Sequence, residues 1–134
     1  MELDEFKVYQ KAMEVGERCW NHVISWDYFA KDTVGKQLVK AADSIAANLS
    51  EGYGRYHYRE AKNFGYYSRG SLYETKTWLK KAVNRDLIKM KDYLSISNDL
   101  KDISVRLNNY LRSIGQSPED RVSETDEDYF LNQE

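Results

Sequence analysis

The sequence predicts an all-α protein: an antiparallel up-down-up-down four-helix bundle with an acidic C-terminal extension. Three observations lead to this prediction. Apolar residues recur at steps of three and four along four long segments. The chain contains only seven glycines and one proline, which is little punctuation for a many-stranded fold. Its 134 residues suit one domain, so we expect a bundle over residues 1–115 and a tail over residues 116–134.

The first two segments each carry one apolar stripe. Asp4 is the expected N-cap of the first segment, whose stripe consists of Phe6, Tyr9, Met13, Gly16, Trp20 and Val23. Asp32 or Thr33 is the expected cap of the second, and Gly52 or Gly54 is expected to end it in a left-handed conformation. The apolar face of this second helix consists of Val34, Leu38, Ala41, Ile45 and Leu49.

The third segment runs from about Tyr58 to Asn84, and the small residues of its stripe allow neighbouring helices to approach closely. This stripe consists of Ala61, Gly65, Ser68, Leu72, Thr75, Leu79 and Ala82. The fourth segment has the most regular stripe, formed by Ile96, Leu100, Ile103, Leu107, Leu111 and Ile114. Short links join these long segments, which makes consecutive helices antiparallel neighbours.

Composition argues against several classes of protein. No apolar run approaches the roughly 18 residues of a membrane span, and the first ten residues lack the apolar block of a signal peptide, so we expect a cytoplasmic protein without membrane contact. Cys19 is the only cysteine, and its place on an apolar stripe indicates core packing. His22 and His57 form no metal-binding motif, and no nucleophile elbow or complete phosphate loop occurs. We therefore expect no enzyme, no metal and no cofactor.

Charge is distributed unevenly along the chain. The net charge is −2, yet residues 116–134 contain seven acids against Arg121, a net of −6. Residues 31–91 contain 13 basic and 6 acidic residues, a net of +7. A basic middle and an acidic tail suggest a polyanionic partner, although charged faces are usually only solvated. The acidic tail also suggests a further hypothesis, in which the tail folds back on the basic middle and competes with nucleic acid for it.

Polar side chains interrupt the apolar pattern of the second and third segments. Asn48 and Glu51 are expected to face Arg69, Ser71 or a neighbouring chain, because an unpaired buried polar group costs about 1–3 kcal/mol. Two interpretations stay open, a hydrogen-bond network that fixes helix register and a functional pocket.

Two motifs carry a resemblance to a known family. QLVKAADSIAANLSEGYGR (residues 37–55) and RGSLYET (residues 69–75) resemble the four-helix-bundle family named after the 23S ribosomal RNA intervening-sequence protein. The resemblance spans about residues 3–115 and leaves the tail outside. The residues that match the family motifs are Ser44, Asn48, Glu51, Gly52, Arg55, Arg69, Gly70, Ser71 and Glu74.

The resemblance implies a bundle that assembles as a homopentamer with a central channel and has no enzymatic activity. Family members are encoded within insertions in ribosomal RNA genes. A related branch, the accessory variability determinant of diversity-generating retroelements, binds nucleic acid and a reverse transcriptase, and its nucleic-acid contacts come from basic residues of the assembled ring. That branch is strongly basic, whereas this chain is net acidic.

The corner NLSEGYGRYHYRE (residues 48–60) places basic residues beside Tyr53, Tyr56 and Tyr58. Tyrosine and arginine favour subunit interfaces, whereas bases interleaved with aromatics suit RNA, so both contacts and simple solvation stay open. The expected function is a non-enzymatic oligomeric module for RNA, DNA or a ribonucleoprotein. The alternative is a protein–protein scaffold that does not touch nucleic acid. The predicted nucleic-acid contacts are Lys36, Lys40, Arg55, Arg59, Lys62 and Arg69.

Overall fold

The protein is described by a computed structural model that covers residues 2–115. Four long helices dominate it: α1 (Lys7–Val23), α3 (Lys36–Tyr53), α4 (Tyr58–Asn84) and α5 (Met90–Ser113). Three short elements precede or join them: η1 (Leu3–Glu5), α2 (Tyr28–Ala30) and the π-helical η2 (Lys31–Gly35). No strand occurs within the described residues, which confirms the all-α prediction and its four helices. The predicted acidic extension lies outside these residues.

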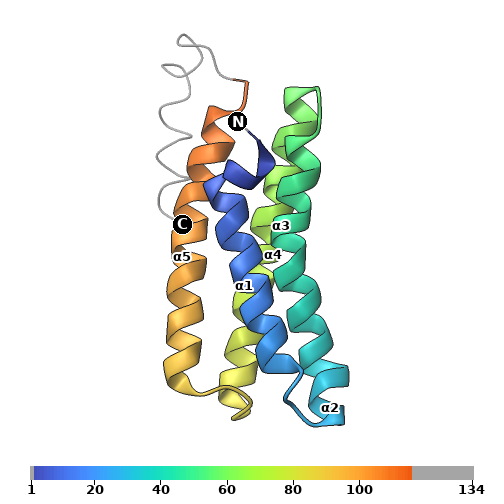
Figure 1. The fold of residues 1–134 in the computed structure, drawn as a ribbon, viewed down its shortest axis with the longest axis vertical. Coiled ribbons are helices and arrows are strands. Elements are labelled where there is room, and N and C mark those ends of the chain that lie inside the picture. Colours follow the sequence, from blue (N-terminus) through green and yellow to red (C-terminus); the bar gives the residue numbers. More distant parts are fainter. Residues whose placement is uncertain (1, 116–134) are drawn as a thin grey trace.

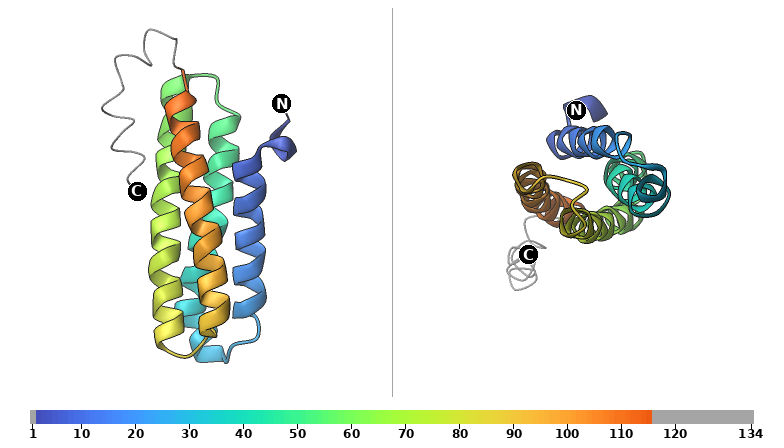
Figure 2. Two further views of the ribbon diagram at one scale, coloured as in Figure 1. Left: turned by 90° about the vertical axis from the view of Figure 1, so that its left-hand side faces the viewer. Right: turned by 90° about the horizontal axis from the view of Figure 1, so that it is seen from below.

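The four helices surround one core. In Figure 1 the chain runs down α1, returns up α3, runs down α4 and rises along α5. The view from below in Figure 2 shows their order around the core, with α1 and α4 on opposite sides. Contacts agree with this order, because α3 packs against α1 and α4, and α5 packs against α4 and α1.

Helix starts differ from the sequence expectation. Phe6, not Asp4, occupies the N-cap of α1 without a side-chain cap, and the Asp4 carbonyl instead accepts a bond from the Gln10 side chain. The helical path that leads into α3 starts earlier than expected, at Asp27, whose Oδ1 accepts the backbone N–H of Ala30 at 3.0 Å. Asp32 and Thr33 therefore lie inside η2 and cap nothing.

The glycine corner also differs. Gly54 is the C-cap of α3, but its φ of −82° is right-handed, and Gly52 remains inside the helix, so neither glycine ends α3 in a left-handed conformation. A Cβ on Gly52 would lie 2.9 Å from the Phe64 Cβ and 3.1 Å from the Ala61 carbonyl oxygen. Gly52 is therefore needed for the close approach of α3 and α4, whereas Gly54 has no such neighbour from another helix.

Three of the four predicted stripes form the core. The apolar stripes of α3 and α4 are buried throughout, and that of α5 is buried except for the half-buried Ile114. α4 also has the predicted limits, Tyr58 and Asn84. These three helices pack as their periodicity indicates.

The stripe predicted for α1 is wrong for Met13 and Trp20, which are 44% and 50% exposed, and Tyr9 is only half-buried. The buried face instead consists of Val8, Ala12, Val15, Gly16, Cys19 and Val23. Smaller side chains face the core because α1 lies close to α3, where a Cβ on Gly16 would meet the Asp43 Oδ1 at 2.8 Å. Cys19 is fully buried, as predicted, and burial raises the pKa of its thiol to about 12.

Candidate nucleic-acid interface

The corner between α3 and α4 holds Arg55, the first predicted nucleic-acid contact. Its guanidinium is hydrogen-bonded to Glu51, four residues earlier on α3, and lies 3.9 Å from a Glu60 oxygen. The same group stacks over the Phe64 ring at 4.9 Å. Two carboxylates therefore offset the charge of Arg55, which makes it a weaker phosphate contact than the sequence suggests.

Lys36 and Lys40 lie at the other end of α3. Nineteen residues separate Lys36 from Arg55, which places them about 28 Å apart along the helix. Lys36 pairs with Asp32 at 3.5 Å, and both lysines line a pocket with Trp20 of α1. The six predicted contact residues therefore do not form one patch.

The remaining predicted bases lie on α4. Within residues 2–115, Arg59 and Lys62 form no ion pair. Arg69 is half-buried, donates to the Asn108 Oδ1 of α5 at 3.3 Å, and lies 5.1 Å from the centre of the Tyr66 ring. Arg69 thus helps to hold α4 against α5 while it remains a cation on this side of the bundle.

Within residues 2–115, Asn48 and Glu51 contact neither Arg69 nor Ser71, two of their expected partners. Asn48 donates to the Ser44 carbonyl of its own helix at 2.9 Å, and Glu51 accepts from Arg55. Ser44 donates to the Lys40 carbonyl at 2.7 Å.

Helices are instead joined by two other polar contacts of α4. The buried Ser68 hydroxyl donates to the Ile45 carbonyl of α3 at 2.8 Å, and Arg69 contacts α5. The Ser71 carbonyl accepts from Thr75 of the same helix, Glu74 is exposed, and a Cβ on Gly70 would meet nothing within 4 Å. These contacts favour a hydrogen-bond network that fixes helix register. Two residues that take part in it, Ser68 and Asn108, were not among those predicted from the sequence.

The three tyrosines predicted as an interface occupy different environments. Tyr53 packs 5.7 Å from Phe6, which in turn stacks edge-on against Tyr110 at 4.8 Å, so Tyr53 helps to close this end of the bundle. Burial, and then Tyr53, raises the pKa of Tyr110. Tyr56 and Tyr58 are 90% and 68% exposed, and these two are available for an external contact.

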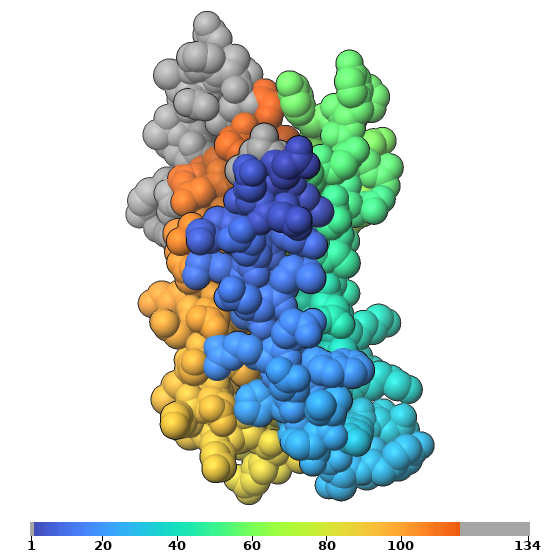
Figure 3. Space-filling view, in the orientation of Figure 1, coloured from blue at the N-terminus to red at the C-terminus, as the bar shows by residue number. Residues whose placement is uncertain are grey.

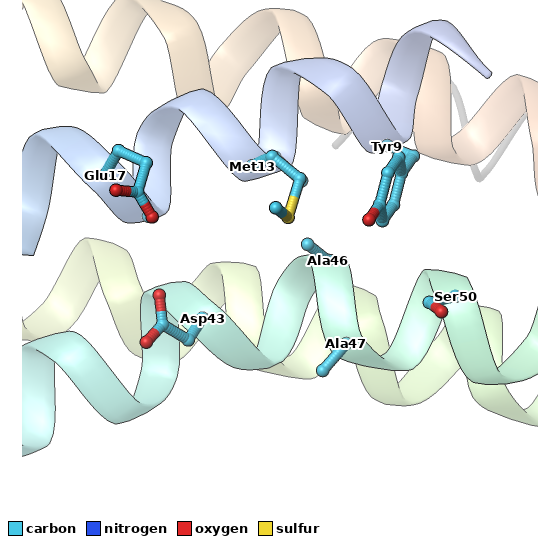
Figure 4. A pocket seen from close by; sticks show the side chains of 9 residues that line it. Tyr9, Met13, Glu17, Asp43, Ala46, Ala47 and Ser50 are labelled. Atoms are coloured by element: carbon cyan, nitrogen blue, oxygen red, sulfur yellow. The ribbon is translucent and has the colours of Figure 1, made fainter. Parts of the chain in front are cut away.

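A pocket between α1 and α3 was not predicted. It has a volume of about 330 Å³, and Figure 4 shows Tyr9, Met13 and Glu17 of α1 opposite Asp43 and Ser50 of α3. Partial burial, and then Glu17, raises the pKa of Asp43. The pocket therefore combines the exposed Met13 with the carboxylates of Glu17 and Asp43.

Part of the basic surface of α4 was not predicted from the sequence. This helix carries six basic and two acidic residues, a net of +4, because Lys76, Lys80 and Lys81 add to the bases already named. A count of the net charge of each predicted helix would have identified these three lysines from the sequence. The other three long helices have net charges between 0 and +1.

Other site types find no support in the described part of the chain. No group of histidine, cysteine and carboxylate side chains within residues 2–115 is placed to hold a metal ion. Among the same residues, no helix combines the length and apolar character that a membrane crossing requires.

Comparison with known proteins identifies the family. The sequence matches the family model described as 23S rRNA-intervening sequence protein over residues 4–109. A crystal structure of a protein of unknown function from the S23 ribosomal protein family of Bacteroides thetaiotaomicron has a similar fold, with a TM-score of 0.71 at 23% sequence identity. The similarity covers 79% of this chain and 99% of that one. No match is found among curated proteins. The family match covers most of the chain, and the protein therefore belongs to the 23S rRNA-intervening sequence protein family.

Proposed function

We propose that the protein is a non-enzymatic, homo-oligomeric binding module for RNA or a ribonucleoprotein, which it contacts through basic side chains of α4. The observation that carries this proposal is the net charge of +4 on α4. Basic side chains gathered on one element neutralise phosphates and supply the sequence-independent part of nucleic-acid affinity.

The ion pairs of the bundle support a basic surface on this side. Two of the three acids of α5 pair with α1, because Lys11 binds Asp102 at 3.0 Å and Arg18 binds Asp99. These carboxylates lie where α5 contacts α1, whereas α4 borders α5 on its other side (Figure 2). A nucleic acid that approaches α4 therefore avoids them.

The face of α1 and α3 supports the oligomeric part of the proposal. On the side of the molecule drawn in Figure 3 these helices lie next to each other. Trp20 and Ile24 are 50% and 49% exposed and line a second pocket of this face with Val39. Contiguous exposed apolar groups mark protein contacts, so we assign this face to a second copy of the chain. The family resemblance favours a pentamer.

A protein–protein scaffold without nucleic-acid contact is the second candidate function. The exposure of Tyr56 and Tyr58, and of Tyr28 and Phe29 in α2, favours it, since aromatic residues are enriched in protein interfaces. The two functions differ in their response to salt, because phosphate contacts weaken steeply with ionic strength and apolar contacts do not.

Titration of the purified protein into labelled RNA and DNA at low and physiological salt tests the proposal, with the mass in solution measured by light scattering. We expect an oligomer whose binding weakens as salt rises and is reduced by Arg59→Ala/Lys62→Ala. An intact oligomer that binds neither nucleic acid would contradict the RNA module and favour the scaffold. A monomer at all concentrations would contradict the oligomeric part.

A further inference from the structure

A regular stripe of basic and aromatic side chains runs along α4. Five bases recur on it at steps of three, four or seven residues, with tyrosines at the intervening positions. In order they are Arg59, Lys62, Tyr66, Arg69, Tyr73, Lys76 and Lys80, hereafter the α4 stripe. Because these steps follow the helical repeat, all seven lie on one side of the helix, over about 31 Å from first to last.

Contacts within the α4 stripe hold bases and rings together. Arg69 lies over Tyr66 at 5.1 Å, and Lys76 lies over Tyr73 at 4.9 Å. Lys80 lies 5.7 Å from the centre of the Tyr93 ring of α5. Tyr66 is packed against the core, whereas Tyr73 is 40% exposed and can receive another ring on its surface. The aromatic groups are therefore fixed at intervals between the charges.

The acids of α4 do not belong to the stripe. Glu60 and Glu74 fall outside its spacing, and Glu60 lies nearest to Arg55 of the corner. Within residues 2–115, no ion pair involves Arg59, Lys62, Lys76 or Lys80. In contrast Lys36 and Arg55, at the two ends of α3, are both ion-paired. The bases of α4 thus retain more charge for an external anion.

From this arrangement we infer that the α4 stripe is a track for single-stranded nucleic acid, an inference that rests on the proposed function. Phosphates bind the bases of the stripe, and unpaired nucleobases stack on Tyr73 between them. A duplex keeps its bases stacked internally, so it gains from the charges but not from the ring. The stripe therefore favours single strands over duplexes of the same sequence.

The position of the stripe is compatible with assembly. α4 and α1 stand on opposite sides of the bundle, so a second copy on the face of α1 and α3 leaves the α4 stripe uncovered (Figure 2). Repetition of the stripe around an oligomer would place several tracks on one particle, which increases the overall affinity for a long strand.

Two matched pairs of variants test the inference on the full chain. The first pair compares Lys76→Gln/Lys80→Gln on the stripe with Lys36→Gln/Lys40→Gln, which removes the same charge from α3. The second compares Tyr73→Leu with Tyr28→Leu, which replaces an exposed tyrosine in α2. Circular dichroism and solution mass verify that each variant is folded and assembled. The probes are labelled single strands of RNA and DNA of about 20 nucleotides, longer than the roughly 4–16 that single-strand sites cover, and the matching duplexes.

The expected salt dependence of binding follows from the number of phosphates that the bases of the α4 stripe neutralise. If the four bases without ion pairs each neutralise one phosphate, the affinity for a single strand falls about 50-fold from 50 to 200 mM salt, and only about 7-fold for Lys76→Gln/Lys80→Gln. Lys36→Gln/Lys40→Gln retains the roughly 50-fold fall in affinity over the same range of salt concentration. Tyr73→Leu weakens single-strand binding by about fivefold or more and leaves duplex binding unchanged, and Tyr28→Leu changes neither.

Three results would overturn the inference. Equal effects of the α3 and α4 lysine variants would mean that the total charge of the protein governs binding and that the position of the bases on the α4 stripe does not. Equal loss of single-strand and duplex binding in Tyr73→Leu would remove the stacking role. These two outcomes leave the proposed function standing, whereas absence of binding by the wild-type protein would contradict both.

Discussion

Replacing Gly52 by alanine tests the packing of the corner between α3 and α4. The new Cβ would lie 2.9 Å from the Phe64 Cβ and 3.1 Å from the Ala61 carbonyl oxygen. Neither atom is at the far end of a flexible side chain, so the two helices must move apart. Gly54→Ala is the matched control, because its φ of −82° suits alanine and its Cβ would meet only carbonyl oxygens of its own helix, at 3.8 and 3.9 Å.

The two substitutions should change the free energy of unfolding in opposite directions. Overpacking at Gly52 costs about 1–3 kcal/mol, and the better helix propensity of alanine returns about 1 kcal/mol. Gly52→Ala should therefore lower the free energy of unfolding by about 0–2 kcal/mol. Gly54→Ala should raise it by about 0.4–1 kcal/mol, since alanine restricts the unfolded chain.

Thermal and urea unfolding followed by circular dichroism measures this difference. The Tm of Gly52→Ala should lie about 1–12 °C below that of Gly54→Ala, because the two free energies of unfolding differ by about 0.4–3 kcal/mol and each kcal/mol shifts the Tm by about 3–4 °C for a chain of this size. Both variants are compared at one protein concentration, because assembly makes Tm depend on concentration. A Gly52→Ala protein as stable as Gly54→Ala would refute the close approach of α3 and α4.

Three further predictions concern single groups and the tail. Cys19, fully buried with a pKa raised to about 12, should not react with a thiol reagent at pH 8 until the protein unfolds, as mass spectrometry would show; rapid labelling of the folded protein would contradict its burial. Partial burial and Glu17 raise the pKa of Asp43 above 3.8, so its contribution to stability is full below that pH and is lost as pH rises through the folded pKa. Asp43→Asn should therefore be more stable than wild type at pH 7 in urea unfolding, with the difference vanishing near pH 3; a constant difference would be inconsistent with this titration. Deletion of residues 116–134, which removes a charge of −6, should raise the affinity for single strands several-fold at low salt, and unchanged affinity would exclude competition by the tail.

The regular parts of the fold were predictable from sequence. A single apolar stripe runs through each of α3, α4 and α5, so the buried face follows from the spacing alone. α1 carries two apolar stripes that are displaced by about one residue, one of larger and one of smaller side chains. Periodicity cannot choose between them, because the choice depends on how closely α3 approaches at Gly16.

The binding surface was predictable only in part. The pair of Arg55 and Glu51 has the spacing of neighbouring turns and is visible in the sequence. The contact between Arg69 and Asn108 joins residues 39 positions apart, and it depends on how α4 packs against α5. Without these partners all predicted bases appear equivalent, whereas the structure separates the ion-paired Lys36 and Arg55 from Arg59 and Lys62, which form no ion pair within residues 2–115.

Lysine footprinting tests most directly the central claim that nucleic acid binds along α4. The full-length protein is acetylated briefly with and without a single-stranded RNA, and the modified lysines are quantified by mass spectrometry. RNA should protect Lys62, Lys76 and Lys80, while Lys36 and Lys40, which lie near the start of α3 beside α1, should react at unchanged rates. Protection of Lys36 and Lys40 alone, or of no lysine under conditions where RNA is bound, would contradict the claim.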